Sequence, residues 1–153
     1  MRSEATANAL VLTGSAALLG GALLFQHIGG LAPCEMCIWQ RWPHATALGL
    51  GLVAWALRSN RAVVALAALA VLVSAALGLF HAGVELKWWE GITACTGGAT
   101  GGSQAEIFAS IMNTPLVRCD AVAWSLFGLS MAGWNAVLSA GIGGGTLWLL
   151  ARK

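Results

Sequence analysis

Four cysteines stand in two pairs, and their spacing indicates the chemistry that this chain could perform. Cys34 and Cys37 form a Cys-x-x-Cys motif, whereas 23 residues separate Cys95 from Cys119. A Cys-x-x-Cys pair can close a small disulfide ring, and a thiol pKa falls when a helix amino terminus or a cation lies nearby. Thiol–disulfide exchange is therefore the first chemistry that the sequence indicates.

An arginine, Arg41, follows Cys37 by four residues. Pro43 suits the first turn of a helix, and a helix beginning there leaves Cys37 and Arg41 at or just before its positive end. If the helix already covers the motif, the two side chains share one face, because residues four apart are neighbours on a helix. Both arrangements place a fixed positive charge beside Cys37 and favour its thiolate.

Two other interpretations of the cysteines stay open at this point. The cysteines could form a stabilising disulfide, or they could be separate buried thiols. Four cysteines could also ligate zinc, but the usual tetrahedral site is built from two Cys-x-x-Cys pairs, and only one such pair is present. We therefore predict no metal site.

The composition indicates a membrane protein. Of the 153 residues, 58% are hydrophobic and 9% are charged, whereas a soluble domain carries roughly 25% charged residues. A helix needs about 20 apolar residues to cross the hydrocarbon core. Three uncharged stretches reach that length, at residues 5–33, 62–84 and 121–151. A fourth, Trp42 to Leu57, has 16 residues and spans only if Arg41 and Arg58 lie at the two interfaces.

These stretches predict an all-α membrane protein, a four-transmembrane-helix bundle that forms a single domain over residues 1–153. The expected helices cover about residues 7–30, 42–57, 62–84 and 121–151. The first stretch is much longer than the roughly 7 to 15 apolar residues of a signal-peptide core, and no small-residue cleavage pattern precedes Pro33. We therefore expect the first helix to be retained.

The distribution of charge predicts the orientation of the bundle. One end collects five of the eight basic residues and a single acid, Glu4: Arg2, Arg58, Arg61, Arg152 and Lys153. Because Lys and Arg concentrate in cytoplasmic loops, we expect both termini in the cytoplasm of a bacterial inner membrane. All four cysteines then face the periplasm, where disulfides form and persist. The net charge of +2 follows from this topology, so no nucleic-acid partner is expected.

The two predicted periplasmic loops differ in length. The first is short and carries Cys34 and Cys37, whereas the second runs from about Glu85 to Asp120. In the second, the Gly-rich stretch "CTGGATGGSQ" predicts a flexible tether for Cys95. The following "SQAEIFASIMN", residues 103–113, has the apolar spacing of a short helix on the membrane surface, although the same spacing suits a loop packed on the bundle.

Three sequence segments carry a family resemblance. They are "CEMCIWQR" followed by "WPH", then "GLFHAGVE" leading to "TAC", and finally "RCDAVAWSLFGLSMAGWN". Together they resemble the bacterial disulfide bond formation protein B (DsbB) family of inner-membrane thiol:quinone oxidoreductases. The resemblance covers nearly the whole chain in helix number, pair order and loop size. The vitamin K epoxide reductase group is similar in outline, but there the loop pair precedes the Cys-x-x-Cys motif.

The resemblance implies a catalytic role for each of the four cysteines. A reduced periplasmic DsbA-like thiol oxidase would attack a Cys95–Cys119 disulfide and form a mixed disulfide with Cys95. The released Cys119 would attack Cys34 and free Cys37 as a thiolate beside the quinone, which would be ubiquinone or menaquinone. Each exchange step requires access and thiolate character. The implied partners are thus the thiol oxidase, the quinone pool and the lipid bilayer.

The same resemblance implies a quinone site near Cys37. Arg41 and His81 would lie beside the quinone, His44 is a further candidate one turn after Arg41, and Trp39 and Trp42 would form walls. Each residue also has an ordinary alternative role: interfacial anchor for the arginine, packed residue for the histidines and aromatic belt for the tryptophans.

Two other classes of function stay open from the sequence alone. The chain could be a haem-binding electron-transfer subunit, with histidines from different helices as axial ligands and the cysteines structural. It could also be a non-enzymatic tetraspan membrane subunit with structural disulfides.

Overall fold

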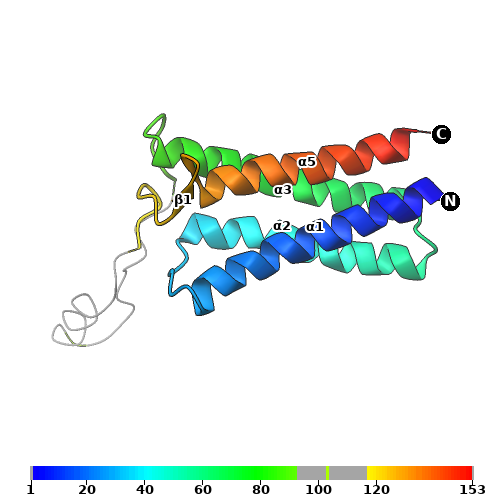
Figure 1. Cartoon of the computed structure of the whole chain (residues 1–153), viewed down its shortest axis with the longest axis horizontal. Helices are drawn as coiled ribbons and strands as arrows, with labels where there is room; N and C mark the ends of the chain where they lie inside the picture. Colours follow the sequence, from blue (N-terminus) through cyan, green and yellow to red (C-terminus); the bar gives the residue numbers. More distant parts are fainter. Residues whose placement is uncertain (1, 93–102, 104–116, 153) are drawn as a thin grey trace.

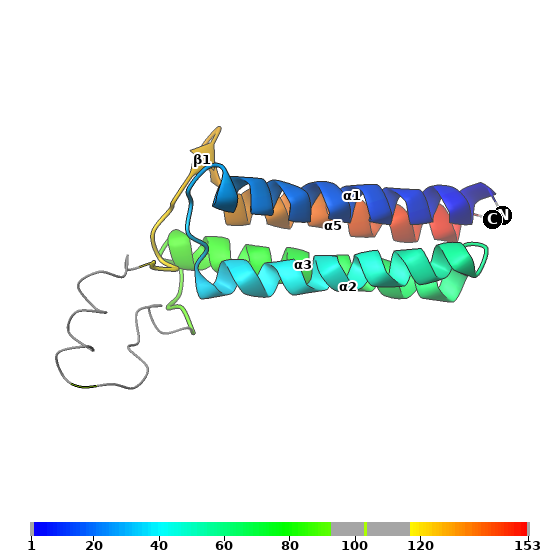
Figure 2. The same cartoon turned by 90° about the horizontal axis from the view of Figure 1, so that it is seen from below.

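Four helices lie side by side and form a bundle in the computed structural model, which describes residues 2–92, 103 and 117–152. The helices are α1 (Arg2–His27), α2 (Glu35–Ala56), α3 (Arg61–Glu85) and α5 (Met131–Ala151). Figure 1 shows both termini at one end of the bundle, together with the α2–α3 turn, and Figure 2 shows α1 beside α5 and α2 beside α3. The predicted all-α, four-helix architecture is confirmed.

Two of the helices are long and apolar enough to cross a membrane by length and composition. They are the segments Ser3–His27 in α1 and Arg61–Glu85 in α3. The helices α2 and α5 run alongside them (Figure 2). The chain is therefore a helical membrane protein in its architecture, and the crossing of the bilayer by all four helices stays a prediction.

Polar caps determine where three of the helices begin. The Cys34 side chain caps α2 by accepting a hydrogen bond from the backbone N–H of Cys37, at 3.2 Å. Asn60 caps α3 through the N–H groups of Ala62 and Val63, and Ser130 caps α5 through the N–H of Gly133. Each cap satisfies N–H groups that have no partner within the helix.

The helix α2 begins seven residues before the predicted start at residue 42. Pro43 was expected in its first turn, and this prediction is wrong, because Pro43 lies inside the helix. The cap at Cys34 and the acidic Glu35 in the first turn favour the earlier start. Pro43 has no N–H to donate to the carbonyl four residues earlier, and the helix continues through it. Cys37 and Arg41 therefore lie on the same helix, as in the second arrangement considered above.

The helix α5 begins at Met131, later than the predicted 121. A hairpin of two short antiparallel strands precedes it, β1 (Ser125–Leu126) and β2 (Leu129–Ser130). Phe127 and Gly128 form its turn with φ values of 53° and 79°, a conformation that stops a helix and suits a tight hairpin. The short helix predicted at residues 103–113 falls outside the described residues, apart from Ser103.

Small residues let the helices approach each other closely. At Gly78 in α3, an added Cβ atom would lie 3.0 Å from the backbone oxygen of Ala132 in α5. At Gly51 in α2 it would lie 2.6 Å from the Leu12 side chain of α1, and Asn8 donates a hydrogen bond to the Gly51 carbonyl at 3.0 Å. Close backbone approach and interhelical hydrogen bonds stabilise helix pairs where lipid provides no hydrophobic driving force.

Candidate redox site

The Cys-x-x-Cys pair lies at the start of α2, at the end of the bundle opposite the termini. The two sulfur atoms are 2.8 Å apart, and Cys34 is 4% exposed. The hydrogen bond to Cys37 and burial raise the pKa of the Cys34 thiol, and the N–H of Cys37 opposes this only in part. The Cys34 thiol donates its hydrogen bond toward the Cys37 sulfur.

A cysteine of the second pair packs against the first pair. Cys119 packs against a buried cluster formed by Cys34, Met36 and Val84, and Cys37 packs against the same cluster. The structure thus brings Cys119 next to Cys34 and Cys37. Cys95, the other member of that pair, lies outside the described residues.

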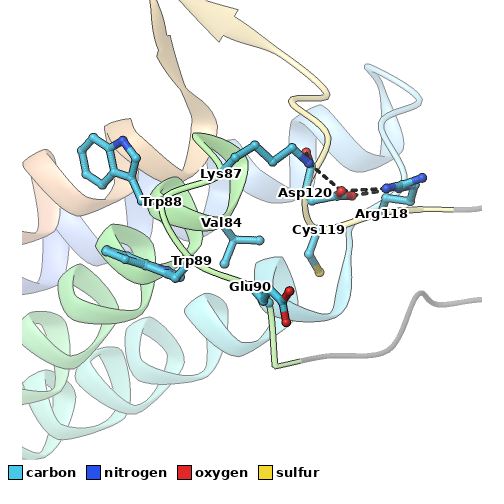
Figure 3. A pocket seen from close by; sticks show the side chains of 9 residues that line it. Val84, Lys87, Trp88, Trp89, Glu90, Arg118, Cys119 and Asp120 are labelled. Carbon is cyan, nitrogen blue, oxygen red and sulfur yellow. Dashed lines mark hydrogen bonds and ion pairs between the residues drawn. The ribbon is translucent and has the colours of Figure 1, made fainter.

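A charged contact lies beside Cys119 at this end of the bundle. Asp120 pairs with Lys87 at 2.6 Å and with Arg118 at 2.7 Å. Hydrogen bonds from these two cations, with the larger effect from Arg118, hold the pKa of the Asp120 carboxyl below its usual range. Figure 3 shows Cys119 next to this ion pair, at a cavity of about 440 Å³ that Trp88 and Trp89 also line.

A second cavity, of about 390 Å³, lies between α1, α2, α5 and the hairpin. Cys37, Arg41 and His44 line it from α2, so the structure brings three predicted site residues to one cavity wall. Most of the other lining residues are apolar or aromatic, among them Leu18, Phe25, Ala123, Trp124, Leu126, Met131, Trp134 and Leu138. A mainly apolar cavity with a few converging polar groups is typical of a small-molecule site.

The Arg41 guanidinium is held in the cavity wall by α1. Its Nη1 donates to the side-chain oxygen of Gln26, and its Nη2 lies 3.4 Å from the backbone oxygen of Ala22. Trp124, just before the hairpin, packs on Phe25 of α1 with ring centroids 5.0 Å apart. The cavity thus combines a fixed positive charge, a thiol and an aromatic wall.

The two tryptophans predicted as cavity walls lie elsewhere. Trp39 and Trp42 line a different hollow together with Pro43, Thr46 and Val73, and Trp42 is 68% exposed. The helical period explains the separation. Residues 37, 41 and 44 repeat at intervals of four and three and form one stripe, whereas Trp39 and Trp42 lie on the opposite side of α2.

The sequence analysis missed several cavity residues on other elements. They are Phe25 and Gln26 in α1, Trp124 before the hairpin, and Trp134 and Asn135 in α5. The periodicity of α2 could have excluded Trp39 and Trp42 from the cavity wall. No local sequence pattern, however, indicates which residues of α1 and α5 face α2.

The second predicted histidine, His81, lies beside the thiols and does not line the cavity with Arg41. It is 3% exposed, and its Nε2 is 3.6 Å from the Cys34 sulfur and 3.2 Å from the Cys119 carbonyl oxygen. Its Nδ1 lies 2.8 Å from Nε2 of Gln40. The ring therefore connects the polar interior of the bundle with both cysteine pairs.

Cys34, Cys37 and His81 are also close enough to hold a metal ion, since their ligand atoms lie within 4.8 Å of one another. Nε2 would face such an ion. A carbonyl oxygen only accepts hydrogen bonds, so the contact with Cys119 requires a proton on Nε2. This tautomer does not suit metal ligation, which needs the Nε2 lone pair.

The fold and the site together define a helical membrane protein with a buried dithiol next to an apolar cavity. Comparison with known proteins gives the family. The family model for disulfide bond formation protein DsbB matches residues 4–149, and the chain belongs to the DsbB family.

Known relatives support this membership over nearly the whole chain. Disulfide bond formation protein B of Polaromonas naphthalenivorans is 35% identical, over 94% of this chain and 89% of the relative. The proteins of the same name from Verminephrobacter eiseniae and Stutzerimonas stutzeri are 36% and 29% identical, each over 94% of this chain and over 84% and 93% of the relative. No solved structure matches the chain significantly.

Membership of this family implies a role in disulfide bond formation and suggests an oxidoreductase. The two helices able to span a membrane are consistent with a membrane location.

Proposed function

We propose that this protein is a thiol:quinone oxidoreductase that reoxidises a periplasmic DsbA-like thiol oxidase and passes the electrons to ubiquinone or menaquinone. The observation that carries the proposal is that Cys37 and Arg41, four residues apart on α2, line one apolar cavity between the helices. A dithiol next to a lipid-soluble oxidant needs such a cavity.

The residues of the cavity fit a quinone head group. A quinone has an apolar ring with carbonyl oxygens that accept hydrogen bonds, and Arg41 offers N–H donors beside Cys37. His44 is 3% exposed, and its Nδ1 has no hydrogen-bond partner among the described residues. Phe25 and Trp124 supply flat apolar surface. Bound there, a quinone supplies the oxidising power, since it accepts two electrons and two protons.

The cysteines carry the electrons toward this cavity by disulfide exchange. The reduced partner attacks the Cys95–Cys119 disulfide, and the released Cys119 thiolate attacks Cys34. The Cys34–Cys37 bond breaks, and Cys37 leaves as a thiolate on the cavity side. The second thiol of the partner then displaces Cys95, and the partner leaves oxidised. Cys95 attacks Cys119, which restores the Cys95–Cys119 disulfide and leaves Cys34 and Cys37 as a dithiol. Oxidation of this dithiol to the Cys34–Cys37 disulfide gives up two electrons and two protons, which balances the reduction of one quinone.

The orientation completes the proposal. Both termini and the basic turn at Arg58 and Arg61 face the cytoplasm, so all four cysteines lie on the periplasmic side of the inner membrane. The shared location of the two termini at one end of the bundle supports this arrangement (Figure 1).

The direct test mixes the purified protein with a reduced thioredoxin-fold oxidase and a quinone, and follows the quinone absorbance. We expect catalytic loss of oxidised quinone in step with oxidation of the partner thiols. A Cys37→Ser variant is the matched control and should be inactive. No quinone reduction by the intact protein, or an intense Soret band from bound haem, would contradict the proposal.

A further inference from the structure

A chain of buried and partly buried hydrogen bonds begins at Asn135 in α5 and fixes the orientation of Gln40 in α2. Asn135 Nδ2 lies 3.2 Å from the backbone oxygen of Ser74, which only accepts, so this atom is the amide nitrogen. It also donates to Gln40 Oε1 at 2.8 Å. The opposite atom of the Gln40 amide, Nε2, donates to the Met36 carbonyl at 3.1 Å. Both amides are therefore oriented by backbone carbonyls.

The orientation of Gln40 determines the tautomer of His81. Because Gln40 Nε2 is a donor, His81 Nδ1 must accept at 2.8 Å, which leaves the ring proton on Nε2. Nε2–H then points to the Cys119 carbonyl at 3.2 Å and to the Cys34 sulfur at 3.6 Å. The ring is 3% exposed, so water does not compete for this donor.

We propose that His81 is a positioning residue for disulfide exchange between the two cysteine pairs: its Nε2–H holds the Cys119 backbone against Cys34. This inference rests on the proposed function and assigns His81 to the transfer between pairs, away from the quinone. In that transfer the Cys119 thiolate attacks the Cys34 sulfur. A Cys34–Cys119 bond forms, the Cys34–Cys37 bond breaks, and the electron pair leaves with Cys37, so no further reactant is needed.

A second contact holds the same segment but differs in exposure. Lys87 donates to the carbonyl of Asp120 at 2.9 Å and pairs with its carboxylate, yet the Lys87 side chain is 63% exposed (Figure 3). Exposed ion pairs contribute little to stability. The buried His81 contact is directed at Cys119 itself, so it controls where this cysteine lies.

The test compares two ways of driving quinone reduction in the same purified protein. A reduced thioredoxin-fold oxidase requires the transfer from Cys119 to Cys34, whereas the small dithiol dithiothreitol reduces the Cys34–Cys37 disulfide directly. A Cys119→Ser variant checks this difference, because it should lose only the first reaction.

The informative variants are His81→Asn and His81→Gln. The Asn amide is too short to replace Nε2–H, so we expect the oxidase-driven rate to fall about 10-fold, as for the loss of one buried hydrogen bond, while the dithiothreitol-driven rate stays within about 2-fold. The Gln amide extends to about the position of Nε2 and should restore most of the oxidase-driven rate. His27→Asn, on the exposed end of α1, is the matched control and should change neither rate.

Two results would overturn the inference. If His81→Asn and His81→Gln lost both reactions equally, the histidine would act at the quinone step or in the stability of the fold. If the oxidase-driven rate were unchanged in both variants, His81 would have no role in the transfer between the pairs. Failure of the unaltered protein to reduce quinone with dithiothreitol would contradict the proposed function instead. The two failures are therefore distinguishable.

Discussion

Replacement of Arg41 by Ala is expected to weaken quinone use without affecting capture of the thiol partner. Arg41 lines the cavity beside Cys37, where Gln26 and the Ala22 carbonyl of α1 hold its guanidinium. The substitution removes the positive charge from the cavity, while Cys119 and its surroundings stay intact. The loss should therefore appear in the dependence of the rate on quinone concentration.

The size of the effect follows from the contact that is lost. A hydrogen bond from a charged donor is worth about 1.5 to 3 kcal/mol, which corresponds to roughly a 10- to 150-fold change in kcat/KM for quinone. The Arg41→Lys variant should have a kcat/KM for quinone between those of the unaltered protein and Arg41→Ala. Its single ammonium group keeps the charge but lacks the planar guanidinium that can bind Gln26 and a ligand together.

The assay measures initial rates over a range of quinone concentrations and, separately, the yield of mixed disulfide with the partner. Arg58→Ala is the matched control, since Arg58 is exposed at the opposite end of the bundle. We expect a normal yield of mixed disulfide in both variants. An Arg41→Ala protein with unchanged quinone dependence would refute the argument and leave Arg41 as an interfacial anchor.

Three further predictions concern the cavity wall, the cysteines and the topology. Trp124→Ala should raise the KM for quinone several-fold, whereas Trp42→Ala should leave it unchanged, because Trp124 lines the cavity with Arg41 and Trp42 lines a different hollow; kinetics with the opposite ranking would contradict this. Replacement of any one of Cys34, Cys37, Cys95 or Cys119 by Ser should abolish steady-state oxidation of the partner by quinone, and Cys119→Ser should trap a mixed disulfide between Cys95 and the partner, visible on a non-reducing gel; partner-driven turnover in any of the four would break the proposed sequence of exchanges. A membrane-impermeant thiol reagent, added after reduction, should modify the cysteines only from the periplasmic side, and labelling from the cytoplasm would reverse the proposed orientation.

The architecture was predictable because uncharged stretches of about 20 residues report directly on helices in a bilayer. The helix boundaries were harder to predict from the sequence. The start of α2 depends on the Cys34 side chain as its cap, which is not one of the usual capping residues, and Pro43 suggested a later start. The start of α5 depends on a turn at Phe127 and Gly128 within an uninterrupted apolar stretch.

The site was predictable only where its residues share one helix. The interval of four between Cys37 and Arg41 places them on one face, and the structure has them on one cavity wall. The hydrogen-bond partners of Arg41 could not be predicted in this way, because Gln26 belongs to α1 and contacts Arg41 only through packing between helices. The role of Asn135, 95 residues from Gln40, is hidden from sequence for the same reason.

The arrangement of α2 and its N-cap explains how one helix would serve two steps of the proposed reaction. Cys37, Arg41 and His44 face the cavity, while Cys34 at the N-cap and Gln40 within the helix both contact His81 of α3. Gln40 belongs to both surfaces, because it lines the cavity and also donates to the His81 ring. The position of the thiol that receives electrons and the wall of the cavity that would receive the quinone are thus held by one rigid element. In the proposed exchanges electrons would move only between neighbouring cysteines, so this rigidity would keep the acceptor thiol next to the cavity without a large movement of the bundle.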